Sequence, residues 1–396
     1  MGPCVEYWMS QIHGNVNRGY MMKRRSILQG GGLALATAAA SPWLSNAHAA
    51  TPIVVGQTAA LTGPQAGFGT AMRDGIKAAL QQANRAGGIG GRMVSLLSMD
   101  DVGDKARTEA NVTELVANRQ VVGLTGCTTR PCSEAAALLA ATEGIALVGA
   151  FSGTPLLYGD KAATTFTTRA SYERELQAIV HHYRQLGAER FGFVHLEDAR
   201  ATNVPLLESI LAREGGKLTV TAGVDRKGPG QNAAAIRTLD ANKPEVLIIL
   251  ANNAPLTGFL REYAPRTLVL PKMVISFVDR EKLLADLGKD APGVGFSVVV
   301  PEYTKEKFTV VRSFLPEARA MNIAVTPVSL EGYITGLALL EGLRQARNES
   351  RTGLIEGLAR VNALDLGYTN IRFSRSERSG SRFVDLSLAS RNAGLV

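Results

Sequence analysis

Three short loops of the chain are rich in hydroxyl-bearing and small residues, and each lies between an apolar run and a stretch with helical periodicity. Their sequences are TGPQAGFG at 62–69, GCTTRPCS at 126–133 and AFSGTP at 150–155. Free backbone N–H groups at a helix N-terminus attract a carboxylate or a similar anion. Each loop alone is explained by ordinary turn chemistry. Three of them at equivalent positions favour a ligand-binding edge on one α/β unit.

The sequence lacks the motifs of several enzyme classes. It contains no G-x-S-x-G nucleophile elbow, no Walker loop and no H-E-x-x-H metal motif. The glycine cluster at 87–91 follows a helical stretch instead of opening one, so it does not predict a dinucleotide site. Asp100 and Asp101 could be catalytic in principle, but no partner base is visible and a solvated cap or hinge contact is favoured. We therefore predict a protein that is not an enzyme and carries no cofactor.

The N-terminal region has the three parts of an export signal. The basic cluster Lys23-Arg24-Arg25 precedes a small and apolar stretch, and the segment ends in Ala-His-Ala at 47–49. We interpret 21–49 as a signal peptide and 1–20 as an upstream extension, with a buried N-terminal helix as the alternative. The arginine pair resembles a twin-arginine export signal, which predicts a location in the periplasm.

Cys127 and Cys132 lie at the two ends of the second loop and are the two cysteines that remain after removal of residues 1–49. An even pair in an exported protein favours a disulfide. A metal site would need more ligands, and His181, His182 and His195 show no ligand spacing. We expect a disulfide between the two cysteines and no metal site.

The length of 396 residues exceeds the size at which one hydrophobic core keeps growing, which predicts two lobes. Removal of residues 1–49 takes away four basic residues and one acidic residue, so the formal net charge falls from +8 to +5. The basic residues are scattered rather than grouped in a stripe with aromatic residues, which argues against a nucleic-acid surface. We expect a monomer with a solvated basic surface.

Apolar runs alternate with amphipathic stretches from residue 53 onward, the sequence pattern of β-α units and parallel sheets. The predicted strands are 53–59, 93–99, 121–126, 146–150, 191–195, 218–222, 246–250, 272–277 and 295–300. The predicted helices are 70–86, 105–118, 173–186, 203–213, 233–242, 329–346 and 353–360. One β-α series ends near residue 165 and another begins near 170, which predicts two similar α/β lobes. The tail at 371–390 has two alternating runs around a polar turn, which predicts a hairpin on a sheet edge.

From about residue 53 to its end, the chain resembles the type I periplasmic substrate-binding proteins of the leucine/isoleucine/valine-binding kind, which serve ATP-driven importers. The most specific stretch is LTGPQAGFGTAMRDGIKAALQQANRAGGIGGR, and further similar segments are EGIALVGAFSGTPLL, TRASYERELQAIV, SLEGYITGLALLEGLR and GSRFVDL. The resemblance implies two lobes, each a mainly parallel sheet flanked by helices, joined by three crossover strands that act as a hinge. The first lobe would hold 53–168 and 300–365, and the second 169–299 and 366–396.

The resemblance also implies a ligand site in the cleft between the lobes. Phe68 matches a cleft aromatic residue, while Thr128 and Thr129 match the hydroxyl loop that holds a ligand carboxylate. Ser152 and Gly153 match its second anchor. From the other lobe, the residues that would close over the ligand are Tyr172, Asn253, Ser276 and Phe277.

The second lobe departs from the pattern of the amino-acid binders. Ser276 and Phe277 stand where those proteins place an acid for the ligand ammonium group, and Asn253 stands where an aromatic residue is usual. An aromatic or aliphatic carboxylate therefore becomes a candidate ligand beside an amino acid. Arg130 and Arg169 would support a carboxylate if either faces the cleft, because arginine binds carboxylates through a planar fork. For Arg169 a salt bridge at the hinge is the alternative.

We therefore expect an exported receptor that captures a small carboxylate-bearing ligand and delivers it to the membrane permease of an ABC importer. A ligand sensor for a membrane signalling protein is the second hypothesis, and an exported enzyme is the remote third. The sequence does not distinguish transport from sensing.

Overall fold

A computed structural model describes residues 51–225, 232–267 and 270–389. The signal peptide, the twin-arginine pair and the upstream extension predicted from the sequence lie outside the described residues. Within these residues, no helix combines the length and the apolar character needed to cross a membrane.

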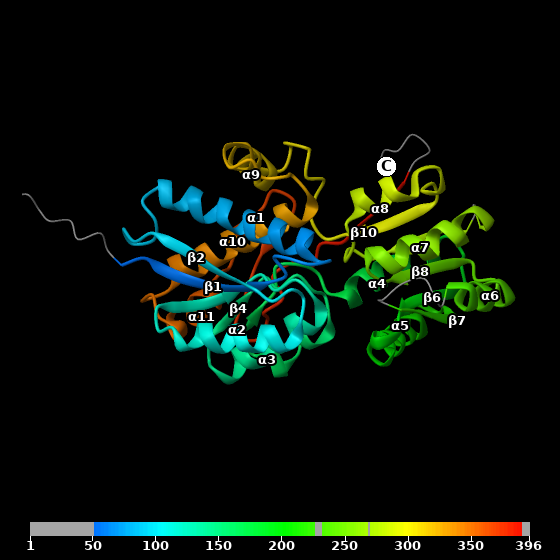
Figure 1. The fold of residues 1–396 in the computed structure, drawn as a ribbon, viewed down its shortest axis with the longest axis horizontal. Helices are drawn as coiled ribbons and strands as arrows, with labels where there is room; N and C mark the ends of the chain where they lie inside the picture. Colours follow the sequence, from blue (N-terminus) through cyan, green and yellow to red (C-terminus); the bar gives the residue numbers. More distant parts are fainter. Residues whose placement is uncertain (1–50, 226–231, 268–269, 390–396) are drawn as a thin grey trace, which may run out of the picture. The chain divides into compact units, whose positions relative to one another are not determined.

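The first sheet has five strands in the order β2-β1-β3-β4-β5, and all neighbouring pairs are parallel. Its strands are β1 (Ile53–Ala59), β2 (Val94–Asp100), β3 (Val121–Thr125), β4 (Ala146–Val148) and β5 (Thr165–Phe166). One face is covered by α1 (Ala66–Arg85), α10 (Pro327–Gln345) and α11 (Arg351–Leu358), and the other by α2 (Lys105–Ala117) and α3 (Arg130–Thr142) (Figure 1). Helix α9 (Thr309–Ala320) packs against α1 and α10. We call this sheet and its helices the first lobe.

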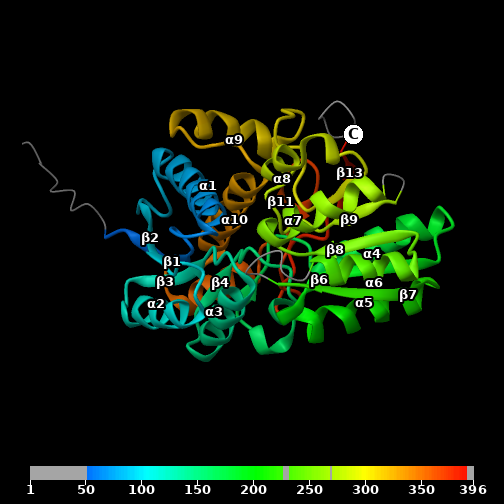
Figure 2. The same ribbon diagram turned by 45° about the vertical axis from the view of Figure 1, so that its right-hand side comes forward.

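The second sheet has six strands in the order β13-β10-β9-β8-β6-β7. Its strands are β6 (Arg190–Leu196), β7 (Lys217–Val224), β8 (Val246–Leu250), β9 (Lys272–Val274), β10 (Val294–Val298) and β13 (Asp385–Leu388). Helices α4 (Tyr172–Gln185) and α5 (Arg200–Glu214) cover one face, and α6 (Asn232–Asn242), α7 (Asn253–Tyr263) and α8 (Arg280–Leu287) cover the other (Figure 2). This sheet and its helices form the second lobe.

Short elements complete the described chain. They are the 3-10 helices Pro155–Tyr158, Asp160–Ala162, Glu197–Ala199, Ala264–Arg266 and Gly288–Asp290, and the two-stranded pair β11 (Leu364–Asp365) and β12 (Asn370–Ile371).

The predicted alternation of strands and helices is confirmed in both lobes, because each predicted strand overlaps an observed one. The central strands are buried along their whole length, as in β8, whose five residues VLIIL are all buried. Continuous apolar runs of this kind mark parallel strands whose two faces are both covered by helices. Helices α7, α8 and α9 were not predicted, and α3 was expected after the second loop without bounds. Pro255 lies in the first turn of α7 and Pro316 lies inside α9, and proline is unfavourable in a helix interior.

The predicted hairpin of the tail is wrong. Its first run forms β12, which pairs with β11, whereas its second run forms β13, which pairs antiparallel with β10 at the edge of the second sheet. The intervening turn bonds to the connection after β5 instead: the Thr167 amide donates to the Arg378 carbonyl, and the Gly380 amide donates to the Thr167 carbonyl. Tertiary partners therefore outcompete the local pairing that the alternating pattern suggested.

The chain passes three times between the lobes, after β5, after β10 and between β12 and β13. The residue boundaries of the lobes given by the sequence stay a prediction.

Helices α1 and α10 approach each other closely at glycine positions. A Cβ on Gly75 would overlap the carbonyl oxygen of Ser329, and one on Gly332 would overlap the carbonyl oxygen of Met72. This contact fixes α10, which carries residues of the site described below, against the first lobe.

Gly75→Ala is expected to lower the free energy of unfolding by about 1–3 kcal/mol, because the added methyl group must push α10 away from α1. Urea unfolding followed by circular dichroism measures the change. Gly67→Ala in the same helix is the matched control, since a Cβ there meets nothing within 4 Å. Equal stability of the two variants would contradict the close contact.

Candidate functional site

Three phenylalanine rings from both lobes meet at the carboxyl ends of the strands. Phe68 lies in the first turn of α1, Phe151 follows β4, and Phe277 follows β9 of the second lobe. Their ring centroids lie 5.4 Å apart for Phe68 and Phe151, 5.8 Å for Phe68 and Phe277, and 5.6 Å for Phe151 and Phe277. These distances fall within the range of favourable aromatic pairs. We call this group the phenylalanine trio; it forms an apolar contact between the lobes.

Backbone amides hold the two threonine hydroxyls of the loop at 126–133. The Thr128 hydroxyl accepts from the Ala60 amide at 3.3 Å, and the Thr129 hydroxyl caps α3 by accepting from the Cys132 amide at 3.4 Å. The structure thus places both threonines at strand ends, as the sequence suggested, and gives each of them a structural bond as well.

The third loop packs under the first turn of α4. The hydroxyl oxygens of Ser152 and Tyr172 lie 3.4 Å apart, and a Cβ on Gly153 would overlap the Tyr172 ring. Only glycine at this position lets the Tyr172 ring lie directly on the loop. The predicted cleft residues Ser152, Gly153 and Tyr172 are therefore brought together.

Arg169 lies on the connection between β5 and α4 and is 1% exposed. Its guanidinium forms ion pairs with Glu175 of α4 at 3.6 Å and with Glu331 of α10 at 3.4 Å, and it donates to the Ser276 hydroxyl. It also lies 4.8 Å from the centre of the Phe151 ring. Arg169 therefore forms salt bridges at the hinge, which was the alternative to a ligand contact. Its partners come from both lobes.

Glu175 is tied to the second lobe by hydrogen bonds. Its carboxylate accepts from the Ser276 amide at 2.8 Å, from the Ser276 hydroxyl at 2.9 Å and from the Ser297 hydroxyl at 2.5 Å. These donors replace the water that a buried carboxylate loses. Ser276, predicted to contact the ligand, also belongs to this network.

The buried charges shift each other's ionisation. Burial raises the pKa of Glu331 to about 7, against the opposing pull of Arg169 and together with repulsion from Glu175. Burial disfavours the charged form of Arg169, but the two carboxylates outweigh it, and the pKa of Arg169 lies above its usual value. Arg169 is therefore charged at every physiological pH, while Glu331 titrates near neutrality.

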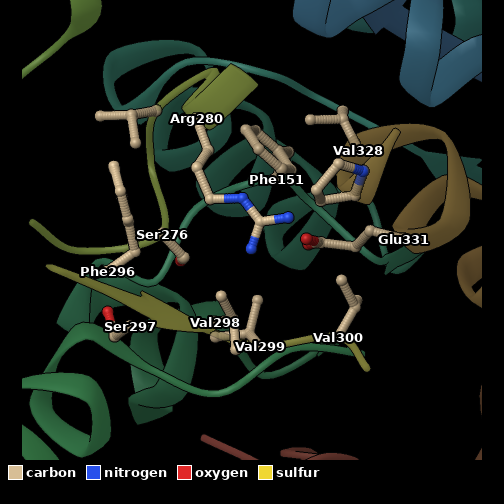
Figure 3. Close-up of a pocket in the computed structure, with 12 residues that line it drawn as sticks. Phe151, Ser276, Arg280, Phe296, Ser297, Val298, Val299, Val300, Val328 and Glu331 are labelled. Carbon is tan, nitrogen blue, oxygen red and sulfur yellow. The ribbon is translucent and has the colours of Figure 1, made fainter. Parts of the chain in front are cut away.

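A cavity of about 30 Å³ lies beside this network, between the lobes. Figure 3 shows the Arg280 guanidinium pointing into the space between Ser276, Val299 and Glu331. The lining residues are Phe151, Ser276, Val278, Arg280, Phe296, Ser297, Val298, Val299, Val300, Pro327, Val328 and Glu331. A larger pocket of about 270 Å³, which includes Phe68, shares Val278, Pro327 and Val328 with it. Both cavities are lined largely by apolar residues with a few charged groups, as small-molecule sites are.

Two predicted site residues have other partners. The Asn253 side chain donates to the Asp279 carbonyl and accepts from the Asp279 amide, both at 2.8 Å, so it holds the loop that leads into α8. Arg130 pairs with Glu134 at 3.2 Å and with Asp198 at 3.9 Å. Neither residue lines the two cavities described above.

The predicted disulfide is not formed in the structure, where Cys127 and Cys132 are buried free thiols. Cys127 packs in the apolar core under α2 and α3, and Cys132 lies in the first turn of α3, near the Thr108 hydroxyl. Burial raises the pKa of both thiols, well above the usual value for Cys127. Core packing, which the loop spacing does not reveal, accounts for both side chains.

The acid pair at the end of β2 is structural. Asp100 accepts from the Leu61 amide at 2.8 Å and from the Thr62 hydroxyl at 2.5 Å. Asp101 is not solvated as predicted, because it is 1% exposed and accepts from Thr58 at 2.9 Å.

Sequence reasoning missed Glu175, Arg280 and Glu331. A signal exists for Glu331, since it is a lone acid near the start of the apolar stretch SLEGYITGLALL at 329–340. A charge in a helix that is otherwise buried requires a partner. Nothing in the local sequence distinguishes Glu175 or Arg280 from solvated charges.

Comparisons with known proteins agree with this fold. The family model described as "Periplasmic binding protein" matches residues 52–386. A possible leucine/isoleucine/valine-binding protein from Rhodopirellula baltica superposes with a TM-score of 0.79 at 23% identity, covering 88% of this chain and 97% of that one. A branched-chain amino acid ABC transporter protein from Thermus thermophilus with bound valine gives 0.77 at 15% identity, covering 87% and 94%. A fatty acid ABC transporter substrate-binding protein from Thermomonospora curvata gives 0.76 at 16%, covering 87% and 91%.

A similar sequence among curated proteins is the Leu/Ile/Val-binding protein homolog 3 of Brucella melitensis, which is 38% identical over 74 residues. The match spans 18% of this chain and 20% of that protein.

Arg169→Met is expected to lower the free energy of unfolding by about 3–5 kcal/mol, because it leaves two carboxylates buried without their cation. Urea unfolding measures it. Arg174→Met, at an exposed position of α4, is the control and should change stability by less than about 0.5 kcal/mol. Similar stability of both variants would mean that the Arg169 network contributes little.

The free energy of unfolding is expected to fall as pH rises from 4.5 to about 7, by on the order of 3 kcal/mol, through Glu331 alone. The sign follows because the folded state holds this proton more tightly than the unfolded chain. The described charged or titratable groups near Glu331 are Arg169, Glu175, Arg280, Tyr158 and Tyr368. Urea unfolding of the wild-type protein and of Glu331→Gln at each pH measures the contribution of Glu331 to the free energy of unfolding. If this free energy depends on pH in the same way for both proteins, the prediction is contradicted.

Proposed function

Because the chain belongs to the periplasmic binding protein family, we propose that it is an extracytoplasmic receptor for a small carboxylate-bearing molecule, which it delivers to an ABC permease. The family and fold are those of substrate-binding proteins rather than of enzymes. Export to the periplasm, by the twin-arginine route, and a monomeric state are part of the proposal.

The proposal rests on the observation that both lobes contribute residues to the site. Phe68, Phe151 and Glu331 come from the first lobe, while Phe277 and Arg280 come from the second. A ligand that contacts both sets binds the closed arrangement better than an open one, so it shifts the equilibrium towards closure. A permease can then recognise the closed form.

The chemistry of the site supports two ligand classes. The phenylalanine trio and the valines around Arg280 suit an apolar or aromatic body. Glu331 of α10 lines the cavity, which supports an amino acid as well as an aromatic or aliphatic acid. Two solved proteins of this fold are described by a bound valine and by fatty acid transport, which covers both classes.

A thermal unfolding screen of residues 50–396 against amino acids, aromatic acids and aliphatic carboxylates tests the function. A true ligand stabilises the native state by about 2.7 kcal/mol at a hundredfold excess over Kd, which raises the unfolding midpoint. Phe277→Ala should lose this shift, because the trio loses its ring from the second lobe.

Leu186→Ala is the control for the screen, since Leu186 is 68% exposed. It should keep the full shift. A screen in which no carboxylate class raises the midpoint of the wild-type protein would reject the proposed ligand class.

A further inference from the structure

Hydrogen bonds around Asp279 fix the start of helix α8, where Arg280 lies. It is the first residue of α8, whose cap Asp279 accepts from the Lys282 amide at 3.0 Å. The Asn253 side chain bonds both the amide and the carbonyl of Asp279. Two elements of the second lobe therefore fix the direction in which the Arg280 side chain leaves the helix.

The Arg280 side chain is nine-tenths buried, with 9% of its surface exposed. Its Nε and Nη2 atoms donate to one oxygen of Glu281, at 3.1 and 3.0 Å, and its guanidinium lies 5.7 Å from the centre of the Tyr303 ring. Glu281 is 40% exposed and also accepts from the Tyr303 hydroxyl at 2.8 Å. Within the part of the chain that the structure describes, the ion-pair partner of Arg280 is Glu281, a carboxylate on the solvent side that also bonds Tyr303.

The inner edge of the guanidinium faces the cavity. Among the described residues, Nη1 of Arg280 makes no hydrogen bond to a carboxylate, and no ion pair within 4 Å joins Arg280 to Glu331 across the space. The pairing of Glu331 is with Arg169. A buried guanidinium with an open edge is costly unless an anion approaches that edge.

The other candidate anchors, Thr128, Thr129 and Arg169, do not line the two cavities described above. Arg169 is also enclosed by two carboxylates of its own. Arg280 is the cation that combines burial, a fixed origin and a direction into the cavity (Figure 3).

We propose that Arg280 binds the carboxylate of the ligand through the open edge of its guanidinium, with the apolar body of the ligand against Phe151 and the neighbouring valines. This inference rests on the proposed function and names the residue that decides acid specificity. Asn253 acts through Arg280 as a positioning residue.

The test measures binding of three acids, leucine, benzoate and octanoate, and of their primary amides, to the wild-type protein and to Arg280→Gln by calorimetry. The acid that binds the wild type should lose affinity about 10- to 100-fold in Arg280→Gln, the range for a hydrogen bond to a charged group. Its amide should bind both proteins within threefold. Lys282→Gln, an exposed charge in the same helix, should leave the affinity for the acid unchanged.

Arg280→Lys provides the second variant, since it keeps the charge but loses the planar fork, and it should bind the acid about tenfold more weakly than wild type. Wild-type affinity for the acid in both Arg280 variants would overturn the inference and leave the receptor function intact. Failure of all three acids to bind the wild-type protein would reject the proposed ligand class and the inference with it.

Discussion

The arrangement of the lobes depends on one buried cation. Arg169 has lost nearly all contact with water, and moving a guanidinium into a protein interior costs several kcal/mol unless anions surround it. Its anions come from different elements, Glu175 from α4 and Glu331 from α10, while Ser276 follows β9. Each of these elements must therefore lie within bonding distance of the same point. The connection between the lobes, the helix that starts the second lobe and the long helix of the first are fixed together by this requirement.

The Phe151 ring joins the charged network around Arg169 to the apolar part of the site. The Phe151 ring lies under the Arg169 guanidinium on one side and within the phenylalanine trio on the other. Since the ring is shared, a change in the position of one lobe moves both the aromatic contact and the charged network. This coupling gives a physical basis for closure around a ligand, because a molecule between the lobes competes with contacts that the lobes otherwise make with each other. Arg280 places a cation beside the cavity, and Glu331 places there an acid that titrates near neutrality.

The numbers of cations and carboxylates in the network explain why Glu331 is the member whose charge changes near neutral pH. Arg169 balances one carboxylate, and Glu175 accepts hydrogen bonds from three donors in addition to its ion pair with Arg169. Glu331 is left with an ion pair to a cation that it shares, in a site where burial favours the neutral acid. Its protonation near neutral pH follows from this competition. The neighbouring cavity is therefore less negative at low pH than at high pH.

The sequence by itself determined the β-α alternation, the strand-end loops and the family, because apolar periodicity and glycine or hydroxyl turns are local properties of the chain. It also indicated that Phe68, Ser152, Gly153, Tyr172 and Phe277 belong near a cleft, and the structure brings them into two contacting groups. Only the tertiary structure decided the roles of Glu175, Arg280 and Glu331, the free state of Cys127 and Cys132, and the pairing of the tail. The physical reason is that burial and charge balance depend on residues far apart in the chain, such as Arg169 and Glu331, whose distance no local pattern encodes.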